Sequence, residues 1–121
     1  MSTLESSPAT YAATAERLRS RLAAVPPGTP VRLGKRTSNL FRPRRPPSGV
    51  VLDVEGLSGV LRVDPVARTA DVLGMTTYED LVDATLPYGL MPAVVPQLRT
   101  ITLGGAVTGL GIEASSFREG L

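Results

Sequence analysis

The first regular pattern along the chain is an amphipathic one. Alanine and leucine recur at helical spacing from Tyr11 to Val25, which predicts a short helix. Its more polar face would carry four charged residues, Glu16, Arg17, Arg19 and Arg21. Pro26-Pro-Gly28 ends the pattern. The Ser/Thr-rich stretch from Met1 to Ala9 has no such periodicity, so we expect it to be frayed.

Short apolar runs after this helix predict strands. Val31–Leu33 is the first, and it leads directly into the donor-rich segment Gly34–Asn39. Val50–Val54, bounded by Gly49 and Gly56, has the composition of a buried strand. The proline- and arginine-rich stretch between them, from Phe41 to Gly49, is expected to be an extended connector.

Alternating apolar and polar positions then predict a hairpin. Its strands are Val60–Asp64 and Thr69–Leu73, joined by the turn Asp64–Arg68, with Arg62 and Asp71 on the exposed side.

A second helix is expected next, because Thr76 or Thr77 can cap it and Glu79 and Asp80 fall in its first turn. It should run through Leu86 and end at Pro87 and Gly89. Since consecutive strands pair as a hairpin, this element order predicts an α+β fold and disfavours a Rossmann fold.

Composition narrows the chemistry that this chain can perform. Its 121 residues include no cysteine and no histidine, which removes disulfides, thiol nucleophiles, imidazole bases and ordinary zinc sites. Any chemistry must therefore come from a cofactor or from residues elsewhere. The chain shows no leader-like or membrane-spanning apolar run, so we expect a cytoplasmic protein. With 12 glycines, 11 prolines and 4% aromatic residues, it resembles part of something larger.

Positive charge is concentrated although the net charge is only +2. Six basic residues lie within fourteen positions that hold no acid: Arg32, Lys35, Arg36, Arg42, Arg44 and Arg45. The positive electrostatic field of these residues would attract a nucleic acid or a phosphate-bearing cofactor. The segment can equally be explained as a solvated linker or a polyproline ligand.

Glycine is dense near the end of the sequence, where Gly104, Gly105, Gly109 and Gly111 fall within eight residues. No G-x-G-x-x-G is present, and the spacing from Gly104 to Gly109 resembles a P-loop but lacks its lysine. The segment either brings backbone N–H groups to an anion, for which a dinucleotide diphosphate is the best candidate, or starts a helix packed tightly against a sheet.

Taken together, these motifs resemble a known family. The Val-Asp-Pro hairpin, the Thr-Tyr-Glu-Asp-Leu-Val helix, Leu90-Met-Pro-Ala-Val-Val-Pro and the segment from Thr102 to Ser116 are similar to the FAD-binding (PCMH-type) domain of vanillyl-alcohol-oxidase-type flavoproteins. The delta(24)-sterol reductase branch is the most similar. The resemblance begins at about Val31 and implies a tail and helix over residues 1–29, followed by the N-terminal part of the FAD-binding domain over residues 30–121.

The resemblance also implies which residues hold FAD. The first diphosphate loop corresponds to Gly34, Lys35, Arg36, Thr37, Ser38 and Asn39, and the second to Thr102, Gly104 and Gly105. Gly109, Gly111, Ser115 and Ser116 would line the flavin side. Backbone N–H groups of Gly104 and Gly105, with Lys35 or Arg36, would neutralise the diphosphate. No catalytic residue and no metal ligand is expected in this stretch.

Where many superfamily members have a Gly-Gly-Gly-His-Ser loop whose histidine can bond the flavin, this chain has Lys35-Arg-Thr37. The resemblance therefore implies non-covalent FAD.

The implied function is an FAD-dependent oxidoreductase that transfers hydride through flavin N5 to or from a C=C bond of a sterol-like or other apolar substrate, with NADPH as a possible electron donor. One alternative is an alcohol or sugar oxidase of the same superfamily. Another is a non-enzymatic basic binding module that contacts nucleic acid or an acidic partner. Under the main hypothesis, an FAD-dependent oxidoreductase, no nucleic-acid partner is expected. The chain alone is expected to aggregate or to pack loosely, because open strand edges would remain.

Overall fold

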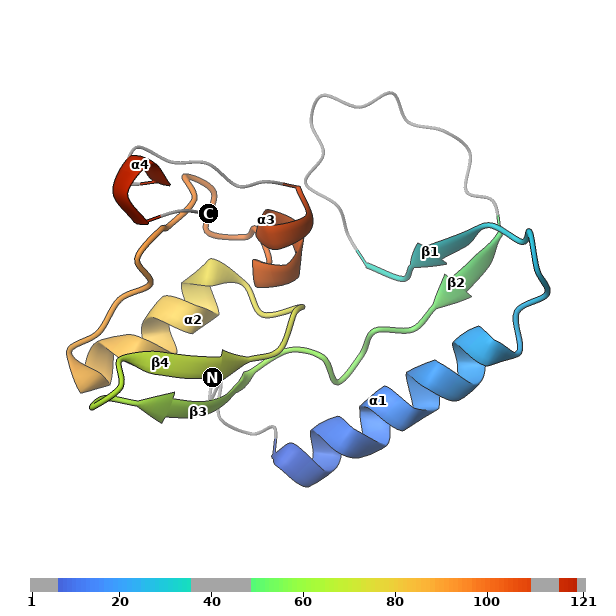
Figure 1. Cartoon of the computed structure of the whole chain (residues 1–121), viewed down its shortest axis with the longest axis horizontal. Coiled ribbons are helices and arrows are strands. Elements are labelled where there is room, and N and C mark those ends of the chain that lie inside the picture. Colours follow the sequence, from blue (N-terminus) through green and yellow to red (C-terminus); the bar gives the residue numbers. More distant parts are fainter. Residues whose placement is uncertain (1–6, 36–48, 110–115, 120–121) are drawn as a thin grey trace.

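A computed structural model describes residues 7–35, 49–109 and 116–119. These residues form two groups of small elements (Figure 1). One part has a helix beside a pair of parallel strands, and the other has a β-hairpin covered by a second helix. The elements are α1 (Pro8–Ala23), β1 (Val31–Leu33), β2 (Val50–Leu52), β3 (Val60–Asp64), β4 (Thr69–Val72), α2 (Tyr78–Thr85), the 3₁₀ turn η1 (Leu86–Tyr88), α3 (Leu103–Thr108) and α4 (Ser116–Glu119).

Helix α1 confirms the predicted amphipathic helix but begins earlier than expected. The Ser7 side chain accepts a hydrogen bond from the Thr10 N–H at 3.1 Å, and Pro8 occupies the first turn. Proline is favoured there because backbone N–H groups in the first turn of a helix have no acceptor within the helix, so the N–H that proline lacks costs no hydrogen bond. The expectation that residues up to Ala9 fray is therefore wrong for residues 7–9, which form the cap and first turn.

Strands β1 and β2 pair in parallel, with Val31 opposite Val50 and Leu33 opposite Leu52. The backbone comes very close at the start of this pair, where the Val50 N–H donates to Pro30 O at 2.8 Å. A Cβ on Gly49 would collide with the Pro30 carbonyl, and Gly49 also has a φ of 85°. Glycine is thus required at this position. The strand β2 ends at Leu52, two residues before the expected end.

The predicted hairpin is confirmed. Strands β3 and β4 pair antiparallel, Arg62 lies opposite Asp71, and the two side chains form an exposed ion pair with Nε–Oδ2 at 3.6 Å. In the turn, the Asp64 carboxylate accepts hydrogen bonds from the N–H groups of Val66 and Ala67 at 3.0 Å. The bond from Ala67, with smaller contributions from Val66 and Arg62, lowers the pKa of Asp64.

The core lies between the hairpin and α2. Val60, Tyr78, Leu81 and Ala84 are buried together, and Ile101, Leu103 and Ala106 pack against them. Burial raises the pKa of Tyr78, which favours its neutral form. Helix α2 confirms the second predicted helix: Thr77 caps it by accepting from the Asp80 N–H at 3.2 Å, and Gly89 follows η1 in the left-handed conformation.

A fully buried threonine ties the hairpin to α2. The Thr76 hydroxyl accepts from the Gly59 N–H at 2.8 Å and donates to the Gly59 carbonyl at 2.9 Å. The segment before α3 then runs beside this corner, because the Tyr78 N–H donates to Ile101 O and the Leu103 N–H donates to Thr76 O.

Helices and short strands therefore combine in an α+β arrangement, as predicted. Within the described ranges, no helix is both long and apolar enough to cross a membrane.

Candidate cofactor-binding site

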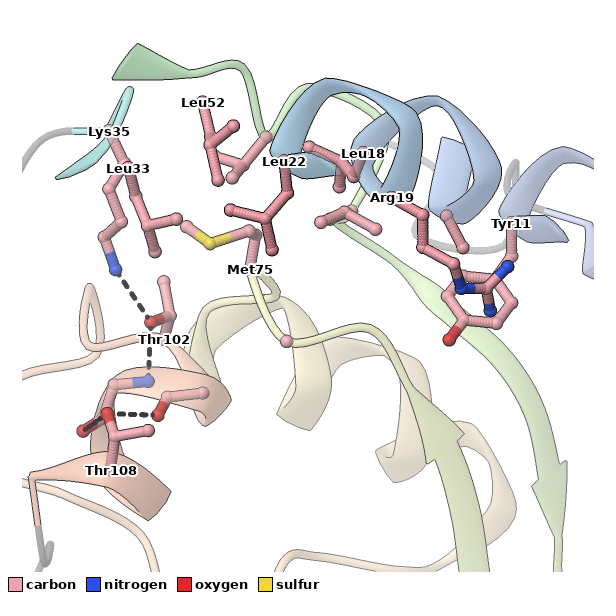
Figure 2. Close-up of a pocket in the computed structure, with 16 residues that line it drawn as sticks. Tyr11, Leu18, Arg19, Leu22, Leu33, Lys35, Leu52, Met75, Thr102 and Thr108 are labelled. Carbon is pink, nitrogen blue, oxygen red and sulfur yellow. Dashed lines mark hydrogen bonds between the residues drawn. The ribbon is translucent and has the colours of Figure 1, made fainter. Parts of the chain in front are cut away.

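A cavity of about 520 Å³ lies where α1, the β1–β2 pair, the loop after β4 and α3 meet (Figure 2). This volume falls in the range of small-molecule sites, roughly 300 to 1,000 Å³. Helix α1 contributes Tyr11, Ala15, Leu18, Arg19 and Leu22. The strands and following loops contribute Leu33, Lys35, Leu52, Val54, Leu57, Gly74 and Met75, and the α3 region contributes Thr102, Gly104, Gly105 and Thr108.

Lys35 of the first predicted diphosphate loop and Thr102 of the second meet at one wall of this cavity. Lys35, which follows β1, donates from Nζ to Thr102 Oγ1 at 3.2 Å, although the two residues are 67 positions apart in the sequence. Figure 2 shows the Lys35 side chain reaching across to Thr102, with Leu33 and Met75 beside it. One ammonium and one hydroxyl therefore face the cavity next to apolar side chains.

Thr102 also caps α3. Its Oγ1 accepts from the Gly105 N–H at 3.1 Å, and the Gly104 N–H donates to Gly74 O at 2.8 Å. Both backbone donors that the sequence assigned to an anion are thus bonded within the protein. The expectation that they are free for a diphosphate is wrong in this structure.

Close packing explains two of the predicted site glycines. A Cβ on Gly104 would lie 2.9 Å from the Gly74 carbonyl oxygen, and one on Gly34 would lie 2.9 Å from Val51 Cγ1. The Gly34 N–H also donates to Leu52 O at 2.7 Å. Of the two interpretations left open for the glycine-rich segment, a helix start packed tightly against its neighbour accounts for Gly104. Because Gly104 has no side chain, only backbone lines the cavity wall at that point.

The remaining predicted residues are placed as follows. Gly109 ends α3, where its N–H donates to Gly105 O at 2.8 Å, and Ser116 begins α4; neither lines the cavity. Six others lie outside the described residues, namely Arg36, Thr37, Ser38, Asn39, Gly111 and Ser115. The same holds for Arg42, Arg44 and Arg45 of the basic segment.

Several cavity residues were missed by sequence reasoning. Gly74 and Met75 connect β4 to α2, and Leu18 and Leu22 come from the apolar side of α1. The periodicity of α1 identifies an apolar face, but it does not say whether that face closes a core or lines a cavity. Gly74 lies directly after a predicted strand, which was a signal for close backbone approach.

The electrostatics of the cavity favour an anion. Its lining contains two cations, Lys35 and Arg19, and no carboxylate. Arg19 is paired with Glu16 at 3.0 Å, whereas Lys35 has no ion-pair partner among the described residues. No group of three or more potential metal ligands occurs in the described part of the chain.

Comparisons with known proteins show to which family the chain is similar. A family model described as "FAD binding domain" matches residues 9–121. The chain is 36% identical over 59 residues to decaprenylphosphoryl-beta-D-ribose oxidase of Mycolicibacterium smegmatis, which covers 49% of this chain and 13% of the relative.

It is 33% identical over 70 residues to the Delta(24)-sterol reductase of Pisum sativum, covering 58% of this chain and 12% of the relative. It is 29% identical over 84 residues to cytokinin dehydrogenase 9 of Oryza sativa subsp. japonica, covering 68% and 16%. The chain therefore spans a small part of the length of the curated relatives it matches. No solved structure matches it significantly.

Proposed function

The chain belongs to the FAD-binding-domain family of flavin oxidoreductases, and from this we propose that it helps hold FAD against the wall formed by Lys35 and Thr102. The single observation that carries the proposal is the 3.2 Å hydrogen bond between these side chains, because it joins the two segments that the resemblance assigns to the diphosphate. A cation and a hydroxyl at one wall, with no carboxylate lining the cavity, fit a diphosphate.

The described residues would bind and orient the cofactor rather than react. Lys35 would place a positive charge beside phosphate oxygens, and Thr102 would donate its hydroxyl hydrogen to one of them. Charge-assisted bonds of this kind contribute about 1.5 to 3 kcal/mol each. Arg36, Thr37, Ser38, Asn39, Gly111 and Ser115 remain proposed contacts by resemblance.

When bound, FAD would supply the redox chemistry by accepting or giving up hydride at flavin N5. Attachment would be non-covalent as far as this chain is concerned, because it contains no histidine and no cysteine.

For the whole protein, we propose oxidation or reduction of a C=C bond in a sterol-like or other apolar substrate, with NADPH as a candidate electron donor. The names of the plant and animal relatives, which are Delta(24)-sterol reductases at 33% to 34% identity, support this choice. An alcohol or sugar oxidase is the second candidate, and the name of the ribose oxidase favours it.

The first test is the visible absorption spectrum of the protein purified from its complete reading frame, before and after denaturation. We expect the folded protein to show a flavin spectrum and, after denaturation and ultrafiltration, the flavin to appear in the filtrate. This result requires a flavin that is bound but not covalently attached. A colourless, folded protein that takes up no added FAD would contradict the proposal and leave the basic binding module as the better hypothesis. Flavin retained by the denatured protein would contradict only the non-covalent attachment.

A further inference from the structure

Helix α1 forms one wall of the cavity without being packed into the core. It contributes five of the residues that line the cavity, yet none of its residues is buried. Tyr11 and Leu22 are among these five, and both remain exposed. Helices in proteins are stabilised mainly by burying an apolar face. This contribution is small for α1, so other contacts have to hold the helix in place.

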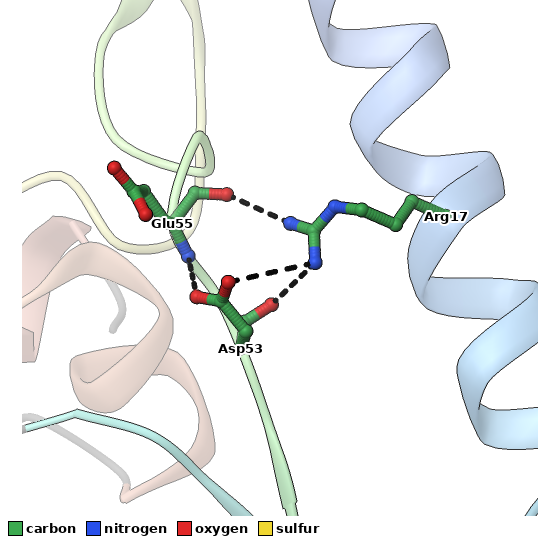
Figure 3. A network of polar contacts seen from close by, with 3 residues as sticks. All are labelled: Arg17, Asp53 and Glu55. Atoms are coloured by element: carbon green, nitrogen blue, oxygen red, sulfur yellow. Dashed lines mark hydrogen bonds and ion pairs between the residues drawn. The ribbon is translucent and has the colours of Figure 1, made fainter.

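Arg17 and Thr14 attach α1 to the connection between β2 and β3. The Arg17 guanidinium donates to Asp53 O at 3.3 Å and to Glu55 O at 3.0 Å (Figure 3). One turn earlier, Thr14 Oγ1 lies 3.0 Å from the position that a Cβ of Gly56 would take. The Arg17 side chain is partly exposed, so water competes for its hydrogen bonds. These contacts can therefore break and re-form without unfolding the core between the hairpin and α2.

The linker between α1 and β1, residues 24–30, has the features of a hinge. Gly28 is exposed, has a φ of 80°, and has nothing within 4 Å of the position of its missing Cβ. The far end of the linker is fixed, because Pro30 O accepts a hydrogen bond from the Val50 N–H at 2.8 Å. Glycine changes its backbone angles more freely than other residues, and hinges consist of a few such loop positions. Helix α1 can therefore rotate about this linker while β1 and β2 stay in place.

From these features we propose that α1 is a hinged cover of the cavity and that the hydrogen bonds of Arg17 are its latch. When the latch breaks, α1 swings away as one body, and a ligand enters or leaves the cavity through the opening. The latch therefore sets the rates of ligand entry and release. With FAD as the ligand, this inference rests on the proposed function.

The other walls of the cavity are joined to one another by hydrogen bonds in which α1 takes no part. Lys35 Nζ donates to Thr102 Oγ1, and the Gly104 N–H donates to Gly74 O. Across from these walls, Figure 2 shows Leu22 of α1 beside Met75, and both residues line the cavity. Rotation of α1 would separate Leu22 from Met75 and expose the Met75 side chain to solvent. The movement therefore has a readout that needs no ligand.

Oxidation of Met75 to its sulfoxide by hydrogen peroxide measures how often the cover opens. The protein from the complete reading frame is freed of flavin and treated with peroxide, and each methionine is followed by peptide mass spectrometry. In Arg17→Leu, Met75 should react roughly fivefold faster, because the lost hydrogen bonds raise the population of the open form. Met91 is exposed and lies outside the cavity, so its rate should not change. Arg21→Leu, on the same helix but outside the cavity, is the matched control and should behave like the unaltered protein.

A reversible lock tests the opposite change. A Cβ on Gly56 would lie 3.8 Å from Thr14 Cβ, within the roughly 3.5 to 4.5 Å that disulfides span. Thr14→Cys combined with Gly56→Cys should therefore cross-link α1 in its closed position. Because Gly56 has a φ of 87°, a cysteine there is strained. The disulfide form is for this reason compared with the reduced form of the same variant, which shares the strain.

The rates of FAD binding and release, followed by flavin fluorescence, show what the lock does. Both rates should be at least about tenfold lower in the disulfide form than in the reduced form, because a cover hinders entry and release alike. The affinity should consequently change by less than about threefold. The unaltered protein, treated with the same oxidant and reductant, should show no change in either rate.

Three results would overturn the inference: an unchanged Met75 rate in Arg17→Leu, an equal acceleration at Met91, or equal FAD rates in the disulfide and reduced forms. The two variants test the inference separately, so if one does not fold, the other decides. Failure of the unaltered protein to bind FAD would instead contradict the proposed function, and the peroxide experiment would still decide whether α1 opens.

Discussion

At the scale of single residues, the contact between Gly104 and Gly74 sets the position of α3. The Gly104 N–H donates to Gly74 O at 2.8 Å, and the α-carbons approach so closely that a Cβ on Gly104 would lie 2.9 Å from that carbonyl oxygen. A Cβ on Gly74 would meet only Gly104 Cα at 4.0 Å, which is an ordinary van der Waals distance. The two glycines are in contact, but only Gly74 has room for a Cβ atom.

We therefore expect Gly104→Ala to destabilise the protein by about 1 to 3 kcal/mol, because a backbone carbonyl cannot move aside as a flexible side chain can. Gly74→Ala is the matched control and should change stability by less than about 1 kcal/mol. Denaturant unfolding of both variants provides the measurement. Equal stability losses in the two variants would show that the close approach at Gly104 does not constrain α3.

At the scale of elements, α1 is attached in an unusual way, since none of its residues is buried. Arg17 makes the connection: its guanidinium donates to Asp53 O at 3.3 Å and to Glu55 O at 3.0 Å, and it lies 3.8 Å from the Asp53 carboxylate (Figure 3). The inner side of the helix lines the cavity instead of filling it. Polar contacts to the chain after β2 thus replace much of the apolar packing that normally holds a helix.

Replacing Arg17 by methionine should loosen α1 without unfolding the hairpin core. We expect amide hydrogen exchange within Pro8–Ala23 to become roughly fivefold to tenfold faster, which corresponds to about 1 kcal/mol of lost contacts. Exchange in α2 should stay unchanged. Arg21→Met, in the last turn of the same helix, is the control and should leave exchange in α1 as it was. Faster exchange throughout the protein would contradict a local role for Arg17.

At the scale of the whole molecule, much apolar surface is exposed for a chain of this size. Met91 is 59% exposed, Val107 64% and Leu22 52%. Both sheets in the described ranges have two strands, so every strand has a free edge that can pair with another chain. Among the described residues, the small core between the hairpin and α2 therefore has to stabilise a folded state that leaves this apolar surface exposed to water.

The 121-residue chain on its own is therefore expected to self-associate or to pack loosely. Light scattering behind size-exclusion chromatography should give a mass that rises with concentration. An apolar dye should bind more strongly to this chain than to the protein from the complete reading frame. A monomer at all concentrations that unfolds in one cooperative transition would refute this prediction.

The sequence alone determined the local elements. The hairpin, α1, β1 and α2 were predicted close to their observed limits because periodicity, capping residues and turn residues act over a few positions. The FAD-binding family was also evident from the sequence motifs. Ser7 and Pro8 could have moved the start of α1 to its observed place, since they form a standard helix start. The division of the chain near residue 29 remains a prediction.

Only the tertiary structure decided how these elements meet. The parallel pairing of β1 with β2, the approach of Gly104 to Gly74 and the bond between Lys35 and Thr102 all join residues far apart in the chain. Residue type alone suggested that glycine N–H groups would face an anion, yet packing uses those groups inside the protein and leaves side chains to face the cavity. Periodicity carries no information about such contacts, because they depend on the path of the chain between the elements.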